Sequence, residues 1–315
     1  IAVAMVVIVR IVDYSKKKSD LVCSFVSFLI LLFLAINSDW VTAILHKKMF
    51  YDDIVFSKRS KYQEIVLTRS GDDFRLYLDG SLQFSTSDEY RYHEMLVYPP
   101  MMACGKREIS VLVLGGGDGL AVRELLRFKN VLHITLIELD DYMVNLARNN
   151  STLRAINNGS LLNDRVYVVT GDAYDYLTRN SLKYDIIIAD FPDPHDETVS
   201  KLYTDSFFKI VKKSLKSGGV FVTQSTSPLF AREAFWCINN TLSSVFKNVI
   251  PYHVFIPTFG DWGYNMAMDK DFLFEDMDET VNTKFFSKDT FKASMHFPPD
   301  SDKLKTEINR FNKPL

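Results

Sequence analysis

Apolar runs alternate with amphipathic segments along most of this chain, beginning near residue 110. The runs are rich in Val, Ile and Leu without polar alternation, which is typical of strands buried on both faces of a parallel sheet. Between them, apolar residues recur at helical spacing. The pattern predicts a doubly wound, mostly parallel α/β sheet of the Rossmann-like kind. The predicted strands lie at 111–114, 134–138, 165–170, 184–190 and 218–225, with helices at 120–128, 141–149 and 203–216.

Ahead of this sheet, segment 62–86 alternates apolar and polar residues around two turn signals, Ser70-Gly71 and Asp79-Gly80. Period-two alternation broken by glycine turns predicts antiparallel hairpins. A helix is expected to begin near Ser87 and to reach the Pro99-Pro100 pair. We therefore expect a small antiparallel β-unit plus helix at 46–100, followed by a Rossmann-like catalytic domain at 101–315.

The first residues are unusually apolar. Segment 1–12 carries one charge, and the run from Leu21 to Ile36 has sixteen residues without any. Roughly twenty apolar residues cross a bilayer, so this run needs a few neighbouring residues to span one. A signal peptide or a buried core helix is the alternative. We expect 1–45 to be the end of a transmembrane region, truncated from a longer protein, with its orientation left open by basic residues on both sides.

Composition excludes several classes of protein. A net charge of −2 with scattered Lys and Arg does not favour a nucleic-acid partner. The three cysteines, Cys23, Cys104 and Cys237, are far apart and lack CxxC spacing. Neither a disulfide framework nor a bound metal is therefore expected.

The first strand of the sheet enters the sequence GGGDG, residues 115–119. Glycines such as Gly115 and Gly117 let the backbone turn sharply and approach a ligand closely. About twenty residues later the next strand ends in Glu138, which is placed to accept hydrogen bonds from ribose hydroxyls. A dinucleotide fingerprint needs a third glycine where this chain has Leu120. The pattern favours the related fold that binds an adenosyl sulfonium over a dehydrogenase.

Acidic residues gather at one predicted edge of the sheet. Asp118, Glu138, Asp172 and Asp190 each follow a predicted strand, and Asp193 comes three residues after Asp190. Each alone is also typical of a helix N-cap or a solvated turn. Together, at the edge where open α/β sheets bind ligands, they indicate a cationic ligand such as a polyamine or a sulfonium.

Short motifs in this order resemble the spermidine synthases. They are YQ, LDG, YHEM, GGGDG, an acid after the second strand, GD after the third, DxxDP after the fourth and IPTF, within residues 62–267. The sequences DFPDP, TSPLFAREAFW and FGDWG are most similar to bacterial membrane-associated polyamine aminopropyltransferases. That resemblance implies transmembrane helices ahead of the synthase domain, a multi-pass inner-membrane protein with a cytoplasmic catalytic domain, and a homodimer formed through the β-unit.

The resemblance also implies a reaction. The 3-aminopropyl group of decarboxylated S-adenosylmethionine, a co-substrate and not a prosthetic group, would pass to an amine such as putrescine and release methylthioadenosine. A neutral amine must attack, so a general base must accept its proton. The family pattern assigns this role to Asp190, with Asp193 holding the acceptor amine and Tyr92 bonding near the attacking nitrogen.

The remaining site residues follow from the same resemblance. Asp118 would attract the aminopropyl ammonium and repel the carboxylate of ordinary S-adenosylmethionine. Glu138 would hold the ribose and Asp172 the adenine amino group. Gln63, Gly115, Gly117 and Ala173 would line the cofactor pocket, and His93, Tyr203, Phe259 and Trp262 the acceptor side, with Gln224 a further candidate.

Some positions depart from the family pattern. Phe259 stands where a tyrosine often follows I-P-T, and HDETVSK, residues 195–201, replaces a proline-containing run. The acceptor amine is therefore left open. A methyltransferase on the same fold and a non-catalytic polyamine-sensing membrane protein are the alternatives. The first needs neither DxxDP nor YHEM, and the second does not need all the catalytic acids.

Overall fold

The computed structural model describes residues 18–36, 50–194, 197–272 and 281–313. The chain divides into two compact units. The first comprises residues 1–54 with 68–70, and the second comprises 55–67 with 71–315.

The main element of the first unit is helix α2, Lys18–Ile36, whose large apolar side chains, such as Phe25 and Ile36, are exposed. Among the described residues no helix is both long and apolar enough to cross a membrane. A run of sixteen uncharged residues rises only ~24 Å as a helix, against a hydrocarbon core of ~30 Å.

This finding corrects the sequence analysis. The predicted transmembrane remnant and membrane partner have no support in the described residues, and the predicted multi-pass inner-membrane localisation is wrong. The parts of the predicted membrane region at 1–17 and 37–45 lie outside the described residues.

Four strands form the small antiparallel sheet that the sequence predicts, in the order β1-β2-β3-β4. The turn between β3 and β4 contains Asp79 at φ 47° and Gly80 at φ 81°. Two consecutive residues with positive φ are typical of the tight hairpin turn that matches the twist of its strands. The strands are β1 Asp53–Arg59, β2 Glu64–Ser70, β3 Asp73–Leu78 and β4 Ser81–Ser85.

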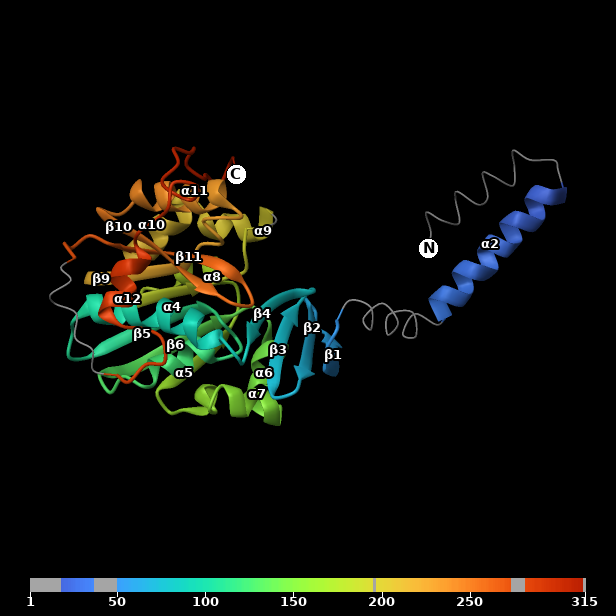
Figure 1. The fold of residues 1–315 in the computed structure, drawn as a ribbon, viewed down its shortest axis with the longest axis horizontal. Coiled ribbons are helices and arrows are strands. Elements are labelled where there is room, and N and C mark those ends of the chain that lie inside the picture. Colours follow the sequence, from blue (N-terminus) through green and yellow to red (C-terminus); the bar gives the residue numbers. More distant parts are fainter. Residues whose placement is uncertain (1–17, 37–49, 195–196, 273–280, 314–315) are drawn as a thin grey trace. The chain divides into compact units, whose positions relative to one another are not determined.

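The large sheet has seven strands in the order β10-β11-β9-β8-β5-β6-β7 (Figure 1). The five strands from β9 to β7 are parallel, which confirms the predicted Rossmann-like sheet. Helices follow the strands and alternate with them along the chain. The strands are β5 Ile109–Gly115, β6 Val131–Glu138, β7 Val166–Thr170, β8 Tyr184–Asp190, β9 Leu215–Gln224, β10 Asn248–Ile256 and β11 Gly260–Met268.

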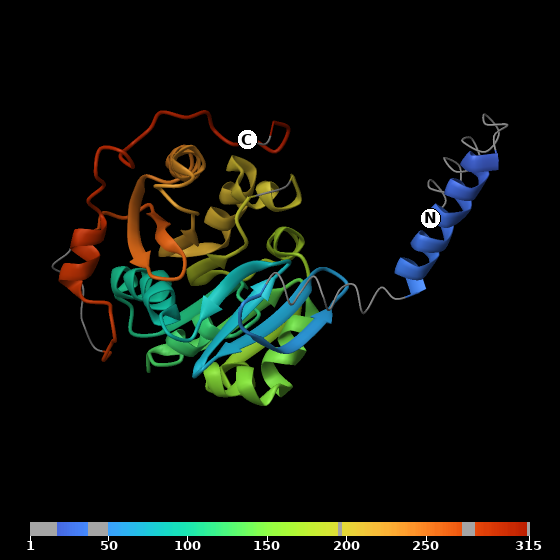
Figure 2. The same ribbon diagram turned by 45° about the vertical axis from the view of Figure 1, so that its right-hand side comes forward.

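Apolar side chains cover both faces of this sheet, and helices pack on each (Figure 2). On β5, Val111 and Val113 face one cluster, while Leu112 and Leu114 face the other. Because both faces are buried, the strands are continuous apolar runs. One face is covered by α4 Glu89–Cys104, α5 Leu120–Leu125 and α6 Asp141–Asn149, and the other by α8 Ala173–Arg179, α10 Asp205–Ser214 and α11 Arg232–Ser243.

The antiparallel hairpin β10–β11 was not among the predicted strands. Pro251 lies inside β10, opposite Asn265, and a proline within an apolar run argues against a strand. Here β10 is the edge strand of the sheet, where a missing N–H group is tolerated. The hairpin matters for function because it carries Phe259 and Trp262 beside the acid-lined edge.

Helix α4 continues through Pro99 and Pro100 to Cys104, four residues beyond the predicted stop. Proline lacks the N–H group that would bond to the carbonyl four residues earlier. For Pro99 that carbonyl belongs to Met95, and it accepts a hydrogen bond from the Tyr252 hydroxyl instead, at 2.9 Å. A tertiary contact thus compensates the break in the helix.

Candidate active site

The acid-lined edge lies where the sheet changes winding direction. From β5, the chain builds outward to β6 and β7 on one side and to β8 and β9 on the other. Such a switch point is where open α/β sheets bind ligands. At the carboxyl end of β5, Gly115 pairs with Asp190, the last residue of β8. The predicted acids Asp118, Glu138 and Asp172 follow β5, end β6 and follow β7 at the same edge.

Two glycines are required by the close approach of site residues, by the backbone of Asp190 in one case and by the side chain of Glu138 in the other. A Cβ on Gly115 would lie 2.3 Å from the Asp190 carbonyl oxygen, and its φ is +79°. A Cβ on Gly117 would lie 2.7 Å from Cγ of Glu138. Real Cβ atoms do not approach heavy atoms this closely, so glycine at these positions lets both acids reach the turn.

Glu138 is fixed by backbone donors. Its Oε2 accepts from the Gly117 N–H at 3.1 Å, and its Oε1 accepts from the Asp140 N–H at 3.0 Å. Burial raises the pKa of Glu138 to about 7, although both hydrogen bonds oppose the shift. Asp140 in turn accepts from the Gln63 side chain at 3.0 Å, which brings this predicted cofactor residue to the end of β6.

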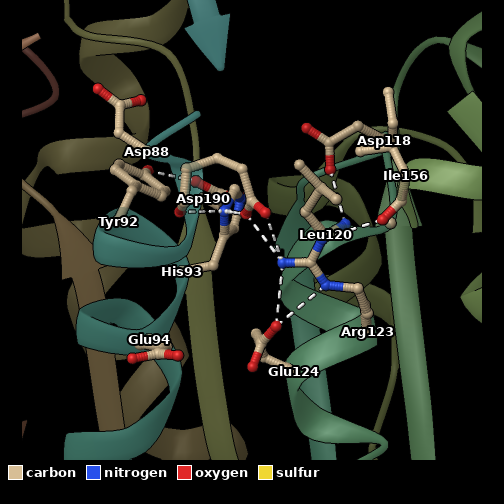
Figure 3. Close-up of polar contacts among 12 residues, drawn as sticks. Asp88, Tyr92, His93, Glu94, Asp118, Leu120, Arg123, Glu124, Ile156 and Asp190 are labelled. Carbon is tan, nitrogen blue, oxygen red and sulfur yellow. Dashed lines mark hydrogen bonds and ion pairs between the residues drawn. The ribbon is translucent and has the colours of Figure 1, made fainter. Parts of the chain in front are cut away.

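Asp118 lies in the turn between β5 and α5, with Oδ1 accepting from the Leu120 N–H at 2.9 Å (Figure 3). The Asn157 side chain donates to the Asp118 carbonyl at 2.8 Å and fixes the turn. Burial raises the pKa of Asp118, and His93 opposes that shift. A cation that binds beside this carboxylate therefore stabilises its charged form.

Asp172 caps the N-terminus of α8 and precedes Ala173, which is buried as the first residue of the helix. Its Oδ1 accepts from the Asp175 N–H, and its Oδ2 accepts from Lys201 Nζ at 3.0 Å. Burial alone would raise the pKa of Asp172, but these two hydrogen bonds outweigh it and lower the pKa. The oxygen predicted to receive adenine thus bonds to a lysine in this structure.

Asp190 and Tyr92 form a short hydrogen bond, with the Tyr92 hydroxyl donating to Oδ1 at 2.5 Å (Figure 3). Burial raises the pKa of Asp190 to about 6, and neighbouring Asp118 adds to the shift, while His93 and the Tyr92 hydrogen bond oppose it. Burial also raises the pKa of Tyr92 well above its usual value. A carboxylate with a pKa near neutrality is suited to accept a proton.

Asp193 meets polar side chains at the end of β9. Gln224 Nε2 lies 3.4 Å from its Oδ1, and Thr226 Oγ1 lies 3.3 Å from its Oδ2. Gln224 also donates to the Tyr203 hydroxyl at 3.0 Å, and Tyr203 donates to the Pro192 carbonyl at 3.1 Å. The structure therefore brings predicted Tyr203 and Gln224 together beneath the DFPDP loop.

Two aromatic side chains of the β10–β11 hairpin pack in a row that ends on Tyr92. Phe259 lies edge-on to the Tyr92 ring at 6.1 Å between centroids, and Trp262 lies 5.3 Å from Phe259. The indole Nε1 of Trp262 is buried and has no hydrogen-bond partner within the described residues. Of the two predicted acceptor-side aromatics, Phe259 thus contacts Tyr92 and Trp262 packs against Phe259.

Several residues of the site were not predicted. Glu89 bonds to predicted His93, and Arg123 bonds to Glu89. Thr226 has a left-handed backbone, φ 59°, although it is not glycine. The only signal for Glu89 in the sequence was an acid in the first turn of a helix, which is common. Residues 195–196, in the run that departs from the family pattern, lie outside the described residues.

This fold and edge define an α/β protein of the Rossmann-like, methyltransferase type with an acid-rich ligand site. The spermine/spermidine synthase domain matches residues 89–278. The chain belongs to that family.

The chain is 41% identical over 275 residues to a polyamine aminopropyltransferase of Leptospira interrogans, covering 87% of this chain and 55% of the relative. It is 46% identical over 237 residues to one of Mycobacterium tuberculosis, covering 74% and 44%. This chain spans about half the length of these curated relatives.

Solved structures agree with this assignment. A spermidine synthase in complex with the transition-state analogue AdoDATO superposes with a TM-score of 0.73 at 27% identity, covering 78% of this chain and 86% of the other. The Thermotoga maritima spermidine synthase gives 0.71, also at 27% identity, covering 78% and 85%.

Proposed function

We propose that this chain is a polyamine aminopropyltransferase of the spermidine synthase kind. It transfers the 3-aminopropyl group of decarboxylated S-adenosylmethionine to an amine and releases methylthioadenosine. The observation that carries the proposal is the half-buried Asp190 carboxylate, bonded to Tyr92 at 2.5 Å, with its pKa raised to about 6. The names of relatives and of solved neighbours support the same chemistry.

The reaction is a direct displacement. The neutral nitrogen of the acceptor attacks the carbon next to the sulfonium, the carbon–sulfur bond breaks, and sulfur keeps the electron pair as a neutral thioether. The product nitrogen loses its proton to Asp190, which acts as general base. Tyr92, whose pKa is raised by burial, stays protonated and orients the carboxylate. Alignment of nitrogen, carbon and sulfur supplies much of the rate.

We assign the nucleoside end of the sulfonium to the β5–β7 side of the site. Glu138 accepts the ribose hydroxyls, Asp172 accepts the adenine amino group, and the glycine turn with Gln63 and Ala173 lines the pocket. Lys201 must then share or release the Asp172 oxygen that it holds at 3.0 Å. Such an exchange is consistent with both groups being half-exposed.

Asp118 selects the co-substrate. The decarboxylated form ends in an ammonium, which a buried carboxylate attracts, and ordinary S-adenosylmethionine also carries a carboxylate there, which the same group repels. Burial raises the pKa of Asp118, which indicates that the protein groups around it compensate its charge poorly. Neutralisation by the ammonium therefore contributes to binding.

On the acceptor side we assign Asp193 to the far part of the amine, with Tyr203, Phe259, Trp262 and His93 around it. Putrescine is the acceptor that the family favours. A homodimer formed through the β-unit, and the division of the chain at about residues 45 and 100, are further parts of this proposal.

The test is a transfer assay on the full chain. It is incubated with decarboxylated S-adenosylmethionine and, separately, putrescine, cadaverine, agmatine or spermidine, and methylthioadenosine is measured by mass spectrometry. Ordinary S-adenosylmethionine serves as the matched control. We expect release that depends on one amine and is absent with the control.

Two results contradict the proposal in different ways. Methyl transfer from ordinary S-adenosylmethionine identifies a methyltransferase and refutes the role given to Asp118. Tight binding of methylthioadenosine without release in the presence of any amine identifies a binding protein instead of an enzyme.

A further inference from the structure

His93 is a buried residue of α4, and the hydrogen-bond partners of one ring nitrogen determine that this nitrogen is protonated. Its Nδ1 lies 2.9 Å from the Glu89 carbonyl oxygen and 2.8 Å from Glu89 Oε2. Both partners are hydrogen-bond acceptors, so Nδ1 carries a proton and donates. The residue is only 2% exposed, and this contact fixes the orientation of the ring.

Glu89 is itself held from the opposite side by Arg123 of α5. Arg123 Nη2 lies 2.9 Å from Glu89 Oε1 and 2.8 Å from Oε2. The guanidinium is anchored in turn, by Glu124 at 3.0 Å and by the Ile156 carbonyl at 3.0 Å (Figure 3). The carboxylate of Glu89 therefore lies between two donors and has little freedom to turn away from His93.

The charged groups around the ring come from several elements. Glu89 lies on the same helix, Asp118 in the β5–α5 turn and Asp190 at the end of β8, while Arg123 lies behind Glu89. Burial alone would lower the pKa of His93, but its hydrogen bond to Glu89 and the three carboxylates outweigh burial and raise the pKa.

One tyrosine contacts this ring, and a second tyrosine contacts the first. Tyr92 contacts it edge-on at 5.0 Å between centroids, and the Tyr264 hydroxyl of β11 donates to the Tyr92 carbonyl. Burial raises the pKa values of both tyrosines well above the usual value for tyrosine, so neither places a charge near His93.

We propose that Glu89 and Arg123 are a positioning pair that holds His93 as an imidazolium facing Asp190 and Asp118. The inference rests on the aminopropyl transfer proposed above. Two buried carboxylates near each other do not both ionise readily. A fixed cation beside them favours the ionised form of both carboxylates. Asp190 is then ready to accept a proton, and Asp118 stays charged to bind the ammonium of the co-substrate.

The influence of Glu89 on the base passes through the imidazole. Burial and Asp118 raise the pKa of Asp190, and His93 and Tyr92 lower it. Removing the negative charge of Glu89 should therefore lower the pKa of His93 and allow the pKa of Asp190 to rise. The acid limb of the pH profile reports that change.

The decisive variant is Glu89→Gln, which keeps the size of the side chain and one acceptor oxygen but removes the charge. We expect the acid limb of kcat/KM to move upward by about one pH unit. At pH 6 the variant then loses about fivefold in kcat/KM relative to wild type, and the loss nearly disappears by about pH 8. His93→Gln should shift the limb in the same direction, and the double variant should add little to either.

Glu124→Gln is the matched control. Glu124 is also buried and also bonds to Arg123, but it has no hydrogen bond to His93 among the described contacts. It tests whether any disturbance of this ion cluster moves the limb. A shift equal to that of Glu89→Gln would overturn the proposal, as would an unmoved limb in Glu89→Gln.

A second readout is independent of catalysis. Proton–carbon NMR of histidine rings in the full chain, assigned with His93→Gln, follows the titration of His93 directly. We expect its pKa to fall in Glu89→Gln and to stay in place in Glu124→Gln. If wild type shows no transfer, this titration still decides the positioning role, so the two proposals fail separately.

Discussion

The two ends of strand β8 carry acids with opposite surroundings, of which Asp185 is buried and Asp190 half-buried. At the amino end, Asp185 bonds to Lys106 and Lys216, each at 2.8 Å, and to the Ser110 N–H and hydroxyl, both at 2.9 Å. Burial alone would raise the pKa of Asp185, but these donors outweigh it and hold the pKa well below its usual value.

At the carboxyl end, Asp190 bonds to the neutral Tyr92 hydroxyl, and its pKa is raised to about 6. The fold compensates one charge completely and leaves the other to be compensated by a ligand. An acid whose charge the protein itself compensates is typical of a structural role. An acid whose charge stays uncompensated, with a raised pKa, is typical of a binding or catalytic site.

The strongest way to test this comparison is to remove each acid separately. Asp190→Asn should lower kcat/KM by about 10²–10⁴-fold, since the general base is lost. Asp185→Asn should leave kcat/KM within a few-fold of wild type, because this residue lies at the opposite end of the strand. Methylthioadenosine release under identical conditions measures both.

The effects of the two substitutions on stability should be the reverse of their effects on activity, with Asp190→Asn stabilising the protein and Asp185→Asn destabilising it. The raised pKa of Asp190 means that the folded protein binds its proton more tightly than the unfolded chain, so stability falls as pH rises from ~4 to about 6. Asp190→Asn removes this cost and should stabilise the empty protein at pH 7 by on the order of 1–3 kcal/mol.

The pKa of Asp185 is lowered on folding, so its contribution is present above ~4 and is lost as the pH falls further. Asp185→Asn should therefore destabilise the protein at pH 7 by roughly 1–3 kcal/mol. Urea unfolding of both variants checks this comparison. Equal destabilisation by the two substitutions would contradict it.

A smaller effect is expected at Glu138. Glu138→Gln removes charge-assisted hydrogen bonds to the ribose and should weaken methylthioadenosine binding by about 10–100-fold. Because burial raises the pKa of Glu138 to about 7, the affinity of wild type should rise with pH as the carboxylate ionises.

From pH 6 to pH 8 this gain amounts to about tenfold. Isothermal titration calorimetry at several pH values measures it. The variant serves as the control, and a dependence on pH as steep as that of wild type would show that another group is responsible.

The smallest change sharpens the comparison at Asp190 itself. Tyr92→Phe deletes one hydrogen bond to Asp190, which should cost about tenfold in kcat/KM. Since that bond lowers the pKa of Asp190, the acid limb of the profile should also move upward. Tyr98→Phe is the control, because Tyr98 lies on the same helix and bonds to Glu124. A drop in activity without movement of the limb would refute the role in proton transfer.

Much of the fold was predictable because its signals are local. Apolar runs such as 184–190 predict buried strands without knowledge of their neighbours, and glycine turns mark their ends. The hairpin β10–β11 was missed because Pro251 is acceptable only at an edge, and edge position is a property of the whole sheet. Helix α4 passes its prolines for a similar reason, a tertiary bond from Tyr252.

The same distinction between local signals and tertiary contacts applies to the residues of the candidate site. Asp118, Glu138, Asp172 and Asp190 each follow a strand, and parallel topology then brings them to one edge. The ion pair between Glu89 and Arg123 joins positions 34 residues apart. No periodicity links those positions, so the contact that orients His93 appears only in three dimensions.

The hairpin β10–β11 also limits how the proposed acceptor site can be redesigned. Tyr252 and Tyr264 stack at 5.1 Å, and their hydroxyls bond to the Met95 and Tyr92 carbonyls of α4. The same hairpin carries the aromatic residues proposed to shape the acceptor pocket. Changing the loop length to admit a larger amine therefore also moves the helix that presents Tyr92. Substrate range and turnover are mechanically coupled, so variants with new acceptors should be sought by exchanging side chains on an unaltered hairpin backbone.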